Sequence, residues 1–513
     1  MQAKRVIGTA TFVVMLAMAS TALAVMPKYV FFFLGDGMSS AQIQATEAYL
    51  TTKNGGSATL AADLQRPENR LHMSKFPILG MQTTYDAHAL MTDSASAATA
   101  FACGIKTMSG VIGMDATKTV GYKSIARLAA EDGRLVGIVS SVSLDHATPA
   151  AYYASVPNRG LMNSIATQMV EAGFAFYGGG GLAAPTKGTN ASDTSNNIWN
   201  LLTANGYTVL NDRETIQALQ QHPKNKVVCI NPWLQDNAAM PYAIDRPATN
   251  LSLAEMTAVA IDTLANEQQS DPAQAQGFFL MVEGGKIDWA CHANDAMATI
   301  GDTLDLNDAV GVALDFYKKY PAQTLIVVTG DHETGGMSVG HATTGYTAYY
   351  DRLLGQTNSA TYFAQNQWKA HKVTSSTNYN YQSPNNLESN PEMLGLMQSV
   401  FGLNWTELNS YQKEKLEDAY DKSMCGQNNN GSDENNLLYG SFEPIIVTIT
   451  HILNERAGIG WTSYSHTGVP VPVFAIGPES QRFSGFYDNT DIAKQMAKAL
   501  DIHQQLPVVK PAP

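Results

Sequence analysis

The stretch FFLMVEGGKIDWACH, residues 278–292, joins an almost continuous apolar run to a group of polar side chains. An apolar run of this length is typical of a strand that is buried on both faces of a parallel sheet. Glu283 ends the run, and Asp288 and His292 follow it four residues apart. If a helical turn lies there, Asp288 and His292 share one of its faces. The stretch therefore predicts a buried strand whose carboxyl end leads into ligand-forming side chains.

Similar apolar runs recur along the chain and alternate with amphipathic helical patterns. The runs cover residues 29–34, 135–140, 278–283, 324–329 and 471–477, and two of the helical patterns cover 161–172 and 304–320. This alternation predicts an α/β fold with a central, mainly parallel sheet and helices on both of its faces. In such sheets, ligands bind beyond the carboxyl ends of the strands.

Composition and charge narrow the class of protein. The 513 residues are 44% hydrophobic and 15% charged, which fits a compact protein with a large core. The net charge is −13, from 32 basic and 45 acidic residues, and it argues against nucleic-acid-specific binding, which needs a basic patch. A small anionic substrate is still compatible with this charge, because a locally positive site can form on a protein whose net charge is negative. The four cysteines are too widely spaced to fix a disulfide pairing, and Cys103 is expected to be a small buried hydrophobe.

The N-terminal segment has the order of features of a secretory signal peptide. Lys4 and Arg5 precede an apolar stretch over residues 6–18, and Ala22-Leu23-Ala24 forms a small-residue cleavage site. We expect residues 1–24 to be removed and the mature protein to be periplasmic or secreted. No later apolar run is long enough to span a membrane.

We expect one catalytic domain over residues 25–505, with two polar insertions. The larger insertion, at about 340–440, is rich in Asn, Tyr, Ser and Gln and contains a helical pattern at 408–424. A smaller insertion covers residues 49–75. Large surface insertions often shape a site or an interface. A run of four glycines at 178–181 predicts a tight turn rather than a phosphate-binding loop, because no helix start follows it directly.

Acidic and histidine side chains follow several of the predicted strands. Asp36 comes after the first strand, and Asp331 and His332 come after another, while Glu283 ends a third. Each alone could be a turn residue or a satisfied core residue, but in a parallel sheet the strand ends meet at one edge, so the carboxylates should converge. His466 stands shortly before the final strand. Mixtures of histidine and carboxylate suit zinc, whereas carboxylate, hydroxyl and water sets suit magnesium.

The stretch LMTDSASAATAFACGIKT, residues 90–107, predicts a helix that begins near Ser94. Ser94 then lies in the first turn, where free N–H groups and the helix dipole favour an anion. It could be only a capping residue, or a nucleophile activated by a metal ion while a second metal stabilises the leaving oxygen. Phosphoryl transfer also needs a cation beside the nonbridging oxygens, and Arg159 is a candidate with bidentate geometry.

Taken together, these residues resemble the alkaline phosphatases from about residue 28 to residue 500, with an interruption by the larger insertion. The matching motifs are GDGM, TDSASAATA, DHATPAAYYASVPNRG, VEGGKIDWACHAND, TGDHETGG and SHTG, in the order of that family. The resemblance implies an alkaline-phosphatase-like fold and metal-dependent hydrolysis of phosphate monoesters at alkaline pH through a phosphoserine at Ser94. Arg159 falls on the phosphate-binding arginine of the family. Members are commonly dimers, so a homodimer is one expectation.

The resemblance also implies two zinc ions and one magnesium ion. One zinc would be held by Asp288, His292 and His466. The other would be held by Asp36, Asp331 and His332, with Ser94 as an exchangeable ligand. Magnesium would be held by Asp36, Thr148 and Glu283. Thr148 and the division among three metals come from the resemblance alone.

Two positions that vary within the family carry His146 and Trp289 in this sequence. Other members have an aspartate and a lysine there, near the magnesium and the phosphate. We therefore expect His146 and Trp289 to lie beside the metal and phosphate sites and to alter magnesium affinity and phosphate retention.

Two kinds of alternative stay open. A phosphodiesterase, phosphomutase or sulfatase of the same superfamily is the first, although the sulfatase pattern Cys/Ser-x-Pro-x-Arg is absent from DSASAA. The second is a secreted metal-storage or phosphate-binding protein on the same scaffold. Ser94 and Arg159 argue against storage, because storage needs neither of them.

Overall fold

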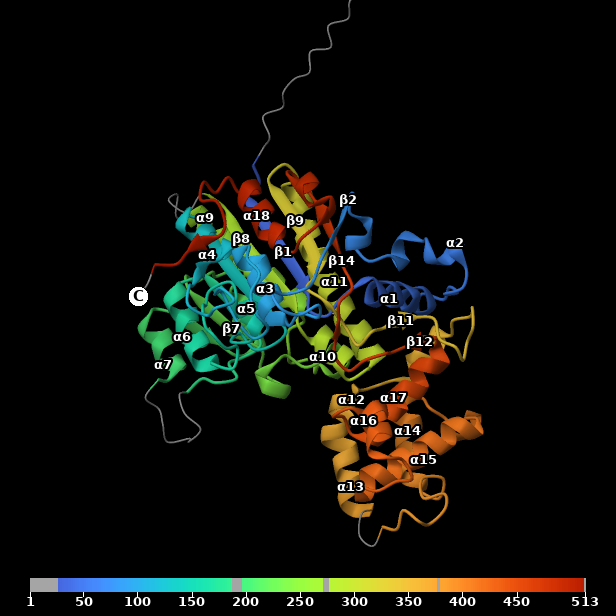
Figure 1. Cartoon of the computed structure of the whole chain (residues 1–513). Helices are drawn as coiled ribbons and strands as arrows, with labels where there is room; N and C mark the ends of the chain where they lie inside the picture. The colour runs from blue at the N-terminus through green and yellow to red at the C-terminus, as the bar shows by residue number, and fades with distance from the viewer. Residues whose placement is uncertain (1–25, 187–195, 271–275, 376–378, 512–513) are drawn as a thin grey trace, which may run out of the picture.

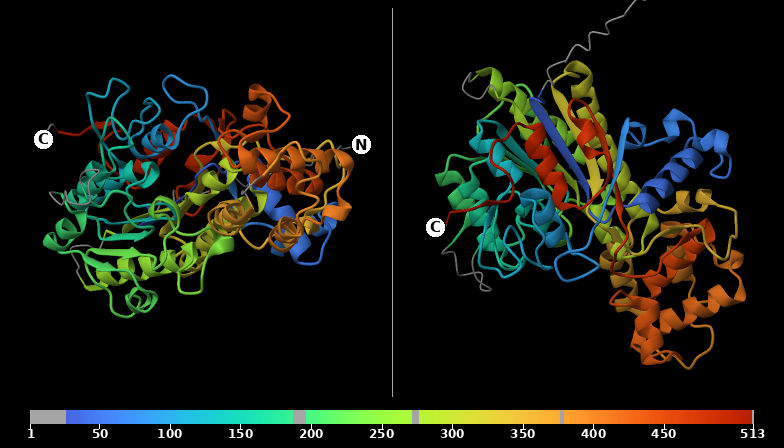
Figure 2. Two further views of the ribbon diagram at one scale, coloured as in Figure 1. Left: turned by 90° about the horizontal axis from the view of Figure 1, so that it is seen from below. Right: turned by 45° about the horizontal axis from the view of Figure 1, so that its top comes forward.

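A computed structural model describes residues 26–186, 196–270, 276–375 and 379–511. The predicted signal peptide, residues 1–24, lies outside the described residues. A twisted sheet with helices on both sides forms the body of the molecule, and a group of helices projects from one side of it (Figure 1, Figure 2).

The sheet has ten strands. Their bounds are β1 Tyr29–Gly35, β2 Ile78–Gln82, β4 Leu135–Ser140, β5 Phe176–Gly179, β6 Thr208–Leu210, β7 Val227–Ile230, β8 Phe278–Gly284, β9 Thr324–Gly330, β14 Val471–Ile476 and β15 Gly485–Tyr487. They lie in the order β15-β2-β14-β9-β1-β8-β4-β5-β7-β6. The seven strands from β9 to β6 are parallel, whereas β14 is antiparallel to both of its neighbours. The prediction of a mainly parallel sheet is confirmed.

Strand β1 shows why a continuous apolar run occupies the centre of this sheet. Val30, Phe32 and Leu34 enter the apolar core on one face, and Phe31 and Phe33 enter the core on the other face. All five side chains are fully buried. Alternate side chains of a strand point to opposite faces, so a strand that is covered on both faces has no position for a solvated polar group.

Helices cover both faces of the sheet, as predicted (Figure 1). One face carries α3 (Ser94–Cys103), α4 (Ile125–Glu131), α5 (Ala147–Ala150), α6 (Met162–Ala172), α7 (Ile198–Ala204) and α18 (Thr490–Ala499). The other face carries α1 (Ser40–Lys53), α8 (Arg213–Ala218), α9 (Leu253–Ser270), α10 (Lys286–His292) and α11 (Ala296–Lys319). Helix α11 begins earlier than the predicted residue 304, because the Asp295 side chain accepts a hydrogen bond from the Ala298 N–H and caps it.

The run of four glycines begins at the end of strand β5, where Gly179 is paired with Ser140 of β4. A Cβ atom on Gly179 would stand 1.9 Å from the carbonyl oxygen of Ser140, and the φ of Gly179 is 126°. Only glycine fits such a backbone approach without strain. The next described helix, α7, begins at Ile198, so this run does not lead directly into a helix.

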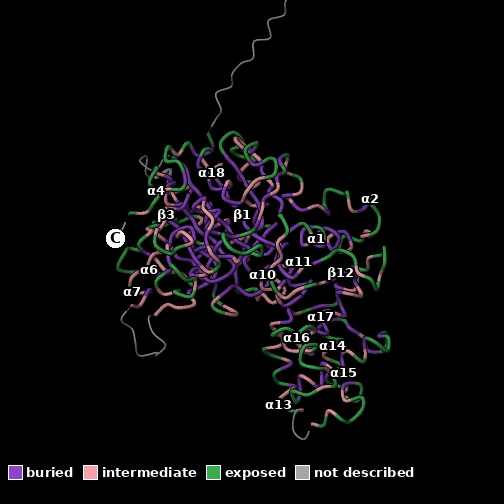
Figure 3. The backbone as a smooth tube through the Cα atoms, in the orientation of Figure 1, coloured by how far each residue is buried: buried purple, intermediate pink, exposed green. Residues whose placement is uncertain are grey.

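The projecting group of helices, residues 350–457, is called the helical unit below. It comprises η6 Tyr350–Gly355, α12 Ala360–Phe363, η7 Ala364–Trp368, α13 Lys369–Ser375, α14 Pro391–Phe401, η8 Trp405–Glu407, α15 Ser410–Cys425, α16 Ser432–Tyr439 and α17 Pro444–Ala457. Helix α15 matches the helical pattern at 408–424. A third apolar core fills this unit and extends to α1. Figure 3 shows buried residues along the helices of this unit, alternating with intermediate and exposed ones.

Short elements connect these parts. They are α2 Ala61–Leu64, η1 Pro67–Asn69, η2 Met73–Lys75, η3 Asp236–Ala238, η4 Ala243–Asp245, η9 Ser480–Phe483 and the strand pairs β3 Tyr122–Lys123 with β16 Val508–Val509, β10 Glu333–Thr334 with β13 His466–Thr467, and β11 Ser338–Val339 with β12 Ile459–Gly460. All four cysteines are free, and Cys103 is buried as predicted. None of the helices in the described ranges is long and apolar enough to cross a membrane.

Candidate active site

The carboxyl ends of β9, β1 and β8 bring three carboxylates to one edge of the sheet. The register pairs Gly35 of β1 with Gly330 of β9, so Asp36 and Asp331 follow their strands side by side. On the other side of β1, Leu34 is paired with Glu283 of β8. Asp36, Asp331 and Glu283 are all fully buried. The edge of the sheet therefore concentrates negative charge in a place that water does not reach.

A first cluster consists of Asp288, His292 and His466. Helix α10 presents Asp288 and His292 four residues apart, and the two His Nε2 atoms each lie 3.4 Å from an Asp288 oxygen and 3.1 Å from one another. Each Nδ1 is 2.6 Å from a backbone carbonyl oxygen, that of Tyr464 for His292 and that of Thr92 for His466. Since Nδ1 must donate to a carbonyl, a neutral ring leaves the Nε2 lone pair free to bind a metal ion.

A second cluster consists of Asp36, Asp331 and His332. The Nε2 of His332 lies 3.3 Å from Asp36 Oδ1 and 3.4 Å from Asp331 Oδ2. Asp331 is fixed through its other oxygen, which accepts a hydrogen bond from the Gly37 N–H at 3.0 Å. Gly37 has a φ of 75°, and a Cβ atom there would lie 2.9 Å from the Asp288 Cα. This glycine therefore lets the chain after β1 pass between the first two clusters.

A third cluster consists of Asp36, His146 and Glu283, whose ligand atoms lie within 4.8 Å of one another. His146 precedes α5, and two residues later the Thr148 hydroxyl donates to Asp36 Oδ2 at 3.4 Å. Ser140, at the end of β4, donates to Glu283. The sequence suggested that His146 lies beside the metal site, and the structure places it in the cluster itself.

Ser94 is the first residue of α3, as the sequence predicted. The Asp93 side chain caps this helix by accepting a hydrogen bond from the Ser96 N–H at 2.9 Å. The Ser94 Oγ lies 3.5 Å from Asp36 Oδ1, the residue shared by the second and third clusters. Ser94 is 2% exposed, so its hydroxyl faces the clusters and not bulk water.

Arg159 stands beside the nucleophile candidate and opens towards solvent. Its Nη1 donates to Asp93 Oδ2 at 2.9 Å, and its Nη2 lies 3.1 Å from His146 Nε2. The side chain keeps 31% of its surface exposed, in contrast to the buried carboxylates. Trp289 stands next to the same histidine, with ring centroids 5.8 Å apart and planes at 73°. The guanidinium is thus held in place while one side stays accessible to an anion.

The burial and close spacing of these side chains shift their pKa values. Burial, together with the neighbouring carboxylates, raises the pKa of Asp331 to about 7 and of Glu283 to about 8, and raises that of Asp36 well above its ordinary value. Burial also acts on Asp288, but His292 and His466 outweigh it and hold the pKa of that carboxyl well below its usual range. Burial and the charge of Arg159 lower the pKa of His146 to about 3, so this imidazole is neutral at any physiological pH.

The three clusters fit metal ions. Buried ligand atoms without a hydrogen-bond partner among the described residues occur in the second and third clusters, namely Asp331 Oδ2, His332 Nε2 and Glu283 Oε1. Leaving such atoms unpaired is costly, and a bound cation would satisfy them and offset the repulsion among the carboxylates. The mixed imidazole and carboxylate donors of the first two clusters suit zinc, and the third, richer in oxygen, suits magnesium.

Comparison with known proteins agrees with this geometry. A family profile described as "Alkaline phosphatase" matches residues 27–502. The chain belongs to the alkaline phosphatase family. Alkaline phosphatase 3 of Bacillus subtilis is 30% identical over 482 residues, which are 92% of this chain and 89% of that protein. The cold-active alkaline phosphatase of Shewanella sp. has a solved structure with a TM-score of 0.69 and 25% identity, covering 92% of this chain and 99% of that one.

The fold is likewise that of alkaline phosphatases. The crystal structure of the Thermus thermophilus alkaline phosphatase superposes with a TM-score of 0.72 at 24% identity, over 96% of this chain and 97% of that one. Alkaline phosphatases are metal-dependent, and the three clusters are the candidate metal-binding groups of this member. The chain is therefore an enzyme of this family.

Some residues that shape the alkaline phosphatase site were not recognised in the sequence. Asp93 both caps α3 and accepts a hydrogen bond from Arg159, and the sequence gives no signal for the second contact. The Thr334 hydroxyl donates to Asp288 Oδ1 at 2.5 Å, and Ser140 donates to Glu283. A hydroxyl residue just after or at the end of a strand is too common to stand out. Only the fold brings these hydroxyls to the carboxylates.

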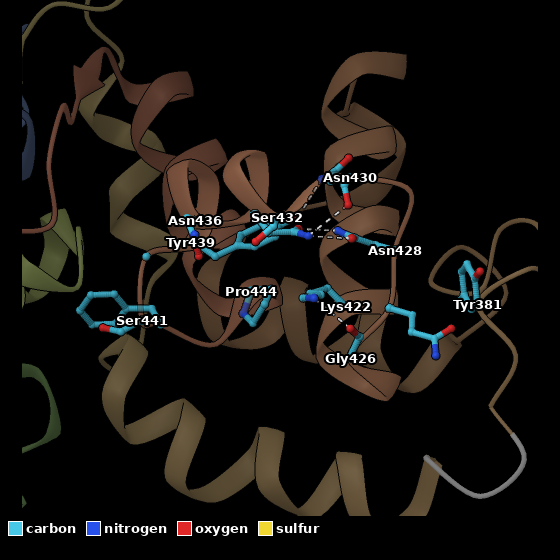
Figure 4. Close-up of a pocket in the computed structure, with 14 residues that line it drawn as sticks. Tyr381, Lys422, Gly426, Asn428, Asn430, Ser432, Asn436, Tyr439, Ser441 and Pro444 are labelled. Atoms are coloured by element: carbon cyan, nitrogen blue, oxygen red, sulfur yellow. Dashed lines mark hydrogen bonds between the residues drawn. The ribbon is translucent and has the colours of Figure 1, made fainter.

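A separate cleft lies in the helical unit, between the end of α15 and the start of α17 (Figure 4). It has a volume of about 660 Å³ and is lined largely by amide and aromatic side chains. Its amides pair with each other, since Asn428 and Asn435 exchange two hydrogen bonds at 2.9 and 3.1 Å. Among the described residues that line this cleft there is no carboxylate or histidine, so these residues offer none of the chemistry of the three clusters.

Proposed function

We propose that this enzyme hydrolyses phosphate monoesters to an alcohol and inorganic phosphate at alkaline pH, through a phosphoserine at Ser94. The observation that carries the proposal is the position of the Ser94 Oγ, at the start of α3 and 3.5 Å from Asp36 Oδ1, where two candidate metal clusters meet. Free N–H groups at a helix start favour an anion, and an adjacent cation favours the deprotonated hydroxyl.

Arg159 is the residue that would bind the phosphoryl group of the substrate. Its guanidinium is fixed by Asp93 and His146, and part of it faces solvent. A planar guanidinium can donate two parallel hydrogen bonds to nonbridging phosphate oxygens. The attack by Ser94 Oγ would break the bond between phosphorus and the ester oxygen, release the alcohol and leave the phosphate on the serine. Water would then cleave the phosphoserine.

The metal assignment is part of this proposal. Two zinc ions would be held by the first cluster (Asp288, His292 and His466) and the second cluster (Asp36, Asp331 and His332, with Ser94 beside them). One magnesium ion would be held by Asp36, Glu283 and Thr148, with His146 beside them. When bound, these ions supply positive charge to the serine oxygen, the leaving oxygen and the transferring phosphoryl group. The predicted signal peptide supports a periplasmic or secreted location.

The test combines three substrates with one variant. The wild-type enzyme is assayed with a phosphate monoester, a phosphate diester and a sulfate ester of the same phenol, before and after exhaustive chelation. We expect strong preference for the monoester and loss of turnover on chelation, restored by zinc plus magnesium. Preference for the diester or the sulfate would contradict the proposed substrate class.

The covalent route is tested separately. Acid quench during turnover of a labelled monoester should trap phosphate on the Ser94 peptide of the wild type. Ser94→Ala should lose most activity and keep its metals, because Asp36, Asp331 and His332 remain. Absence of label on Ser94 at saturating substrate would exclude the phosphoserine, while leaving the substrate class to the first test.

A further inference from the structure

Helix α10 carries a buried ammonium group that the proposed mechanism does not use. Lys286, the first residue of α10, is fully buried, and its Nζ has no hydrogen-bond partner among the described residues. The nearest carboxylate oxygen, Asp236 Oδ2, lies 3.7 Å away. Burying an ammonium without hydrogen bonds costs free energy, and burying an apolar side chain of the same length would cost less. The negative charges of Asp236, Asp302 and Asp245 offset part of this cost, so the surroundings of Lys286 favour a charged group at this position.

Two aromatic rings surround this ammonium. The Nζ lies 3.7 Å from the centroid of the Tyr242 ring and 4.6 Å from that of the Trp289 ring. A cation within about 6 Å of a ring is attracted to the π face, and the attraction is strongest where water is excluded. Lys286 and Trp289 are three residues apart and share one face of α10, whereas Asp288 and His292 point to the first cluster.

The indole of Trp289 leads on to the phosphate site. Its ring stands nearly perpendicular to the His146 ring, with centroids 5.8 Å apart. His146 Nε2 is in turn 3.1 Å from Arg159 Nη2. An unbroken chain of contacts thus runs from Lys286 through Trp289 and His146 to the guanidinium of Arg159.

We propose that Lys286 is a positioning residue of the phosphate site: its ammonium holds Trp289 against His146, and His146 holds Arg159. Lys286 itself does not touch the substrate. The proposal rests on the proposed function, because it takes Arg159 as the group that binds phosphate. Lys286 thus affects phosphate affinity indirectly, through its contact with the Trp289 ring.

The test measures KM, kcat and the inhibition constant of inorganic phosphate for one chromogenic phosphate monoester. Lys286→Met should raise the inhibition constant and KM about five- to tenfold, with a smaller change in kcat. A purely structural role would lower the melting temperature without this split. Lys413→Met is the matched control, since it removes an ammonium 5.0 Å from the Trp405 ring in the helical unit and should leave all three constants unchanged.

A double-mutant cycle decides whether the effect passes through Trp289. Trp289→Leu alone should raise the phosphate inhibition constant, and Lys286→Met should add little in that background. Additive effects, or an unchanged constant in either single variant, overturn the proposal. If Lys286→Met does not fold, an unchanged constant in Trp289→Leu still overturns it. Failure of the wild type to hydrolyse the monoester would instead refute the proposed function.

Discussion

The imidazole rings of His332 and His466 are stacked, with centroids 3.6 Å apart and planes 19° from parallel. His332 belongs to the second cluster and His466 to the first, and they come from opposite ends of the short β10–β13 region. The stack brings a ring of the first cluster against a ring of the second, and the pairing of β10 with β13 joins the two chain segments that carry them. A change in one ring therefore alters the surroundings of the other.

Removal of one stacked ring should cost a metal ion. His466→Ala deletes one of three ligands of the first cluster and exposes His332, so we expect loss of about one equivalent of zinc and a fall in kcat/KM of about 100-fold or more. Metal analysis of the purified protein and steady-state kinetics measure both. His341→Ala, in a loop away from the clusters, is the control. Retention of the wild-type zinc content by His466→Ala would show that this ring is not a ligand.

The close passage at Gly37 should be sensitive to a single methyl group. Gly37→Ala brings a Cβ to 2.9 Å from both the Asp288 Cα and the Thr334 Oγ1, so it should displace the first cluster and lower activity at least tenfold. Gly55→Ala is the matched control, because its φ of 79° gives the same backbone strain with no atom within 4 Å. We expect Gly55→Ala to lose about 1 kcal/mol of stability and keep its activity. Equal activity in the two variants would contradict the steric explanation.

The ion pair between Asp93 and Arg159 should affect phosphate binding separately from helix capping. Asp93→Asn keeps a good capping residue for α3 and removes the charge that fixes Arg159. The pair is partly exposed, so we expect an increase of only a few-fold in KM and in the phosphate inhibition constant, with an almost unchanged melting temperature. Asp93→Ala should show the same kinetic change plus a stability loss of about 1 kcal/mol. Identical melting temperatures for both variants would exclude the capping role.

The stability of the protein should depend on pH through His451 in α17. Burial, with Lys415 and His341 nearby, lowers the pKa of His451 to about 4, and its Nε2 donates to Asn294 Oδ1 at 2.9 Å. An unfolded histidine titrates near 6.5, so the unfolded state binds the extra proton first as the pH falls. The contribution of His451 is therefore complete above pH 6.5 and is lost between pH 6.5 and about 4, by roughly 1–3 kcal/mol.

The role of His451 is tested by comparing the pH dependence of stability in the wild type and in a variant. Unfolding free energies of wild type and His451→Gln are compared at pH 7, 6, 5 and 4.5, because glutamine keeps a donor for Asn294. The wild type should lose stability faster with falling pH than the variant. The exposed His503→Gln should follow the wild type. Parallel curves for wild type and His451→Gln would show that His451 is not the titrating group.

The strands and the main candidate residues could be predicted because their signals are local. The run at 29–34 is apolar throughout since both faces of β1 are buried, and Asp36 and Asp331 follow their strands directly. The direction of β14 could not be predicted, because an apolar pattern carries no information about parallel or antiparallel pairing. The helices of the helical unit other than α15 were not predicted individually; several are short, and α17 is rich in β-branched residues, which are also typical of strands. The contact between Lys286 and Trp289 could not be predicted, because it depends on how α10 places these two side chains relative to each other.

The two oxygens of Asp36 face different neighbours: Oδ1 lies near His332 and Ser94, and Oδ2 accepts from Thr148. Cations at the second and third clusters would thus compete for, or reinforce, the charge of a single carboxylate. Thermodynamic linkage requires that filling either site change the affinity of the other by the same factor. Occupancy of the two sites would thus be coupled through one carboxylate, and neither site could be titrated with its cation independently of the other.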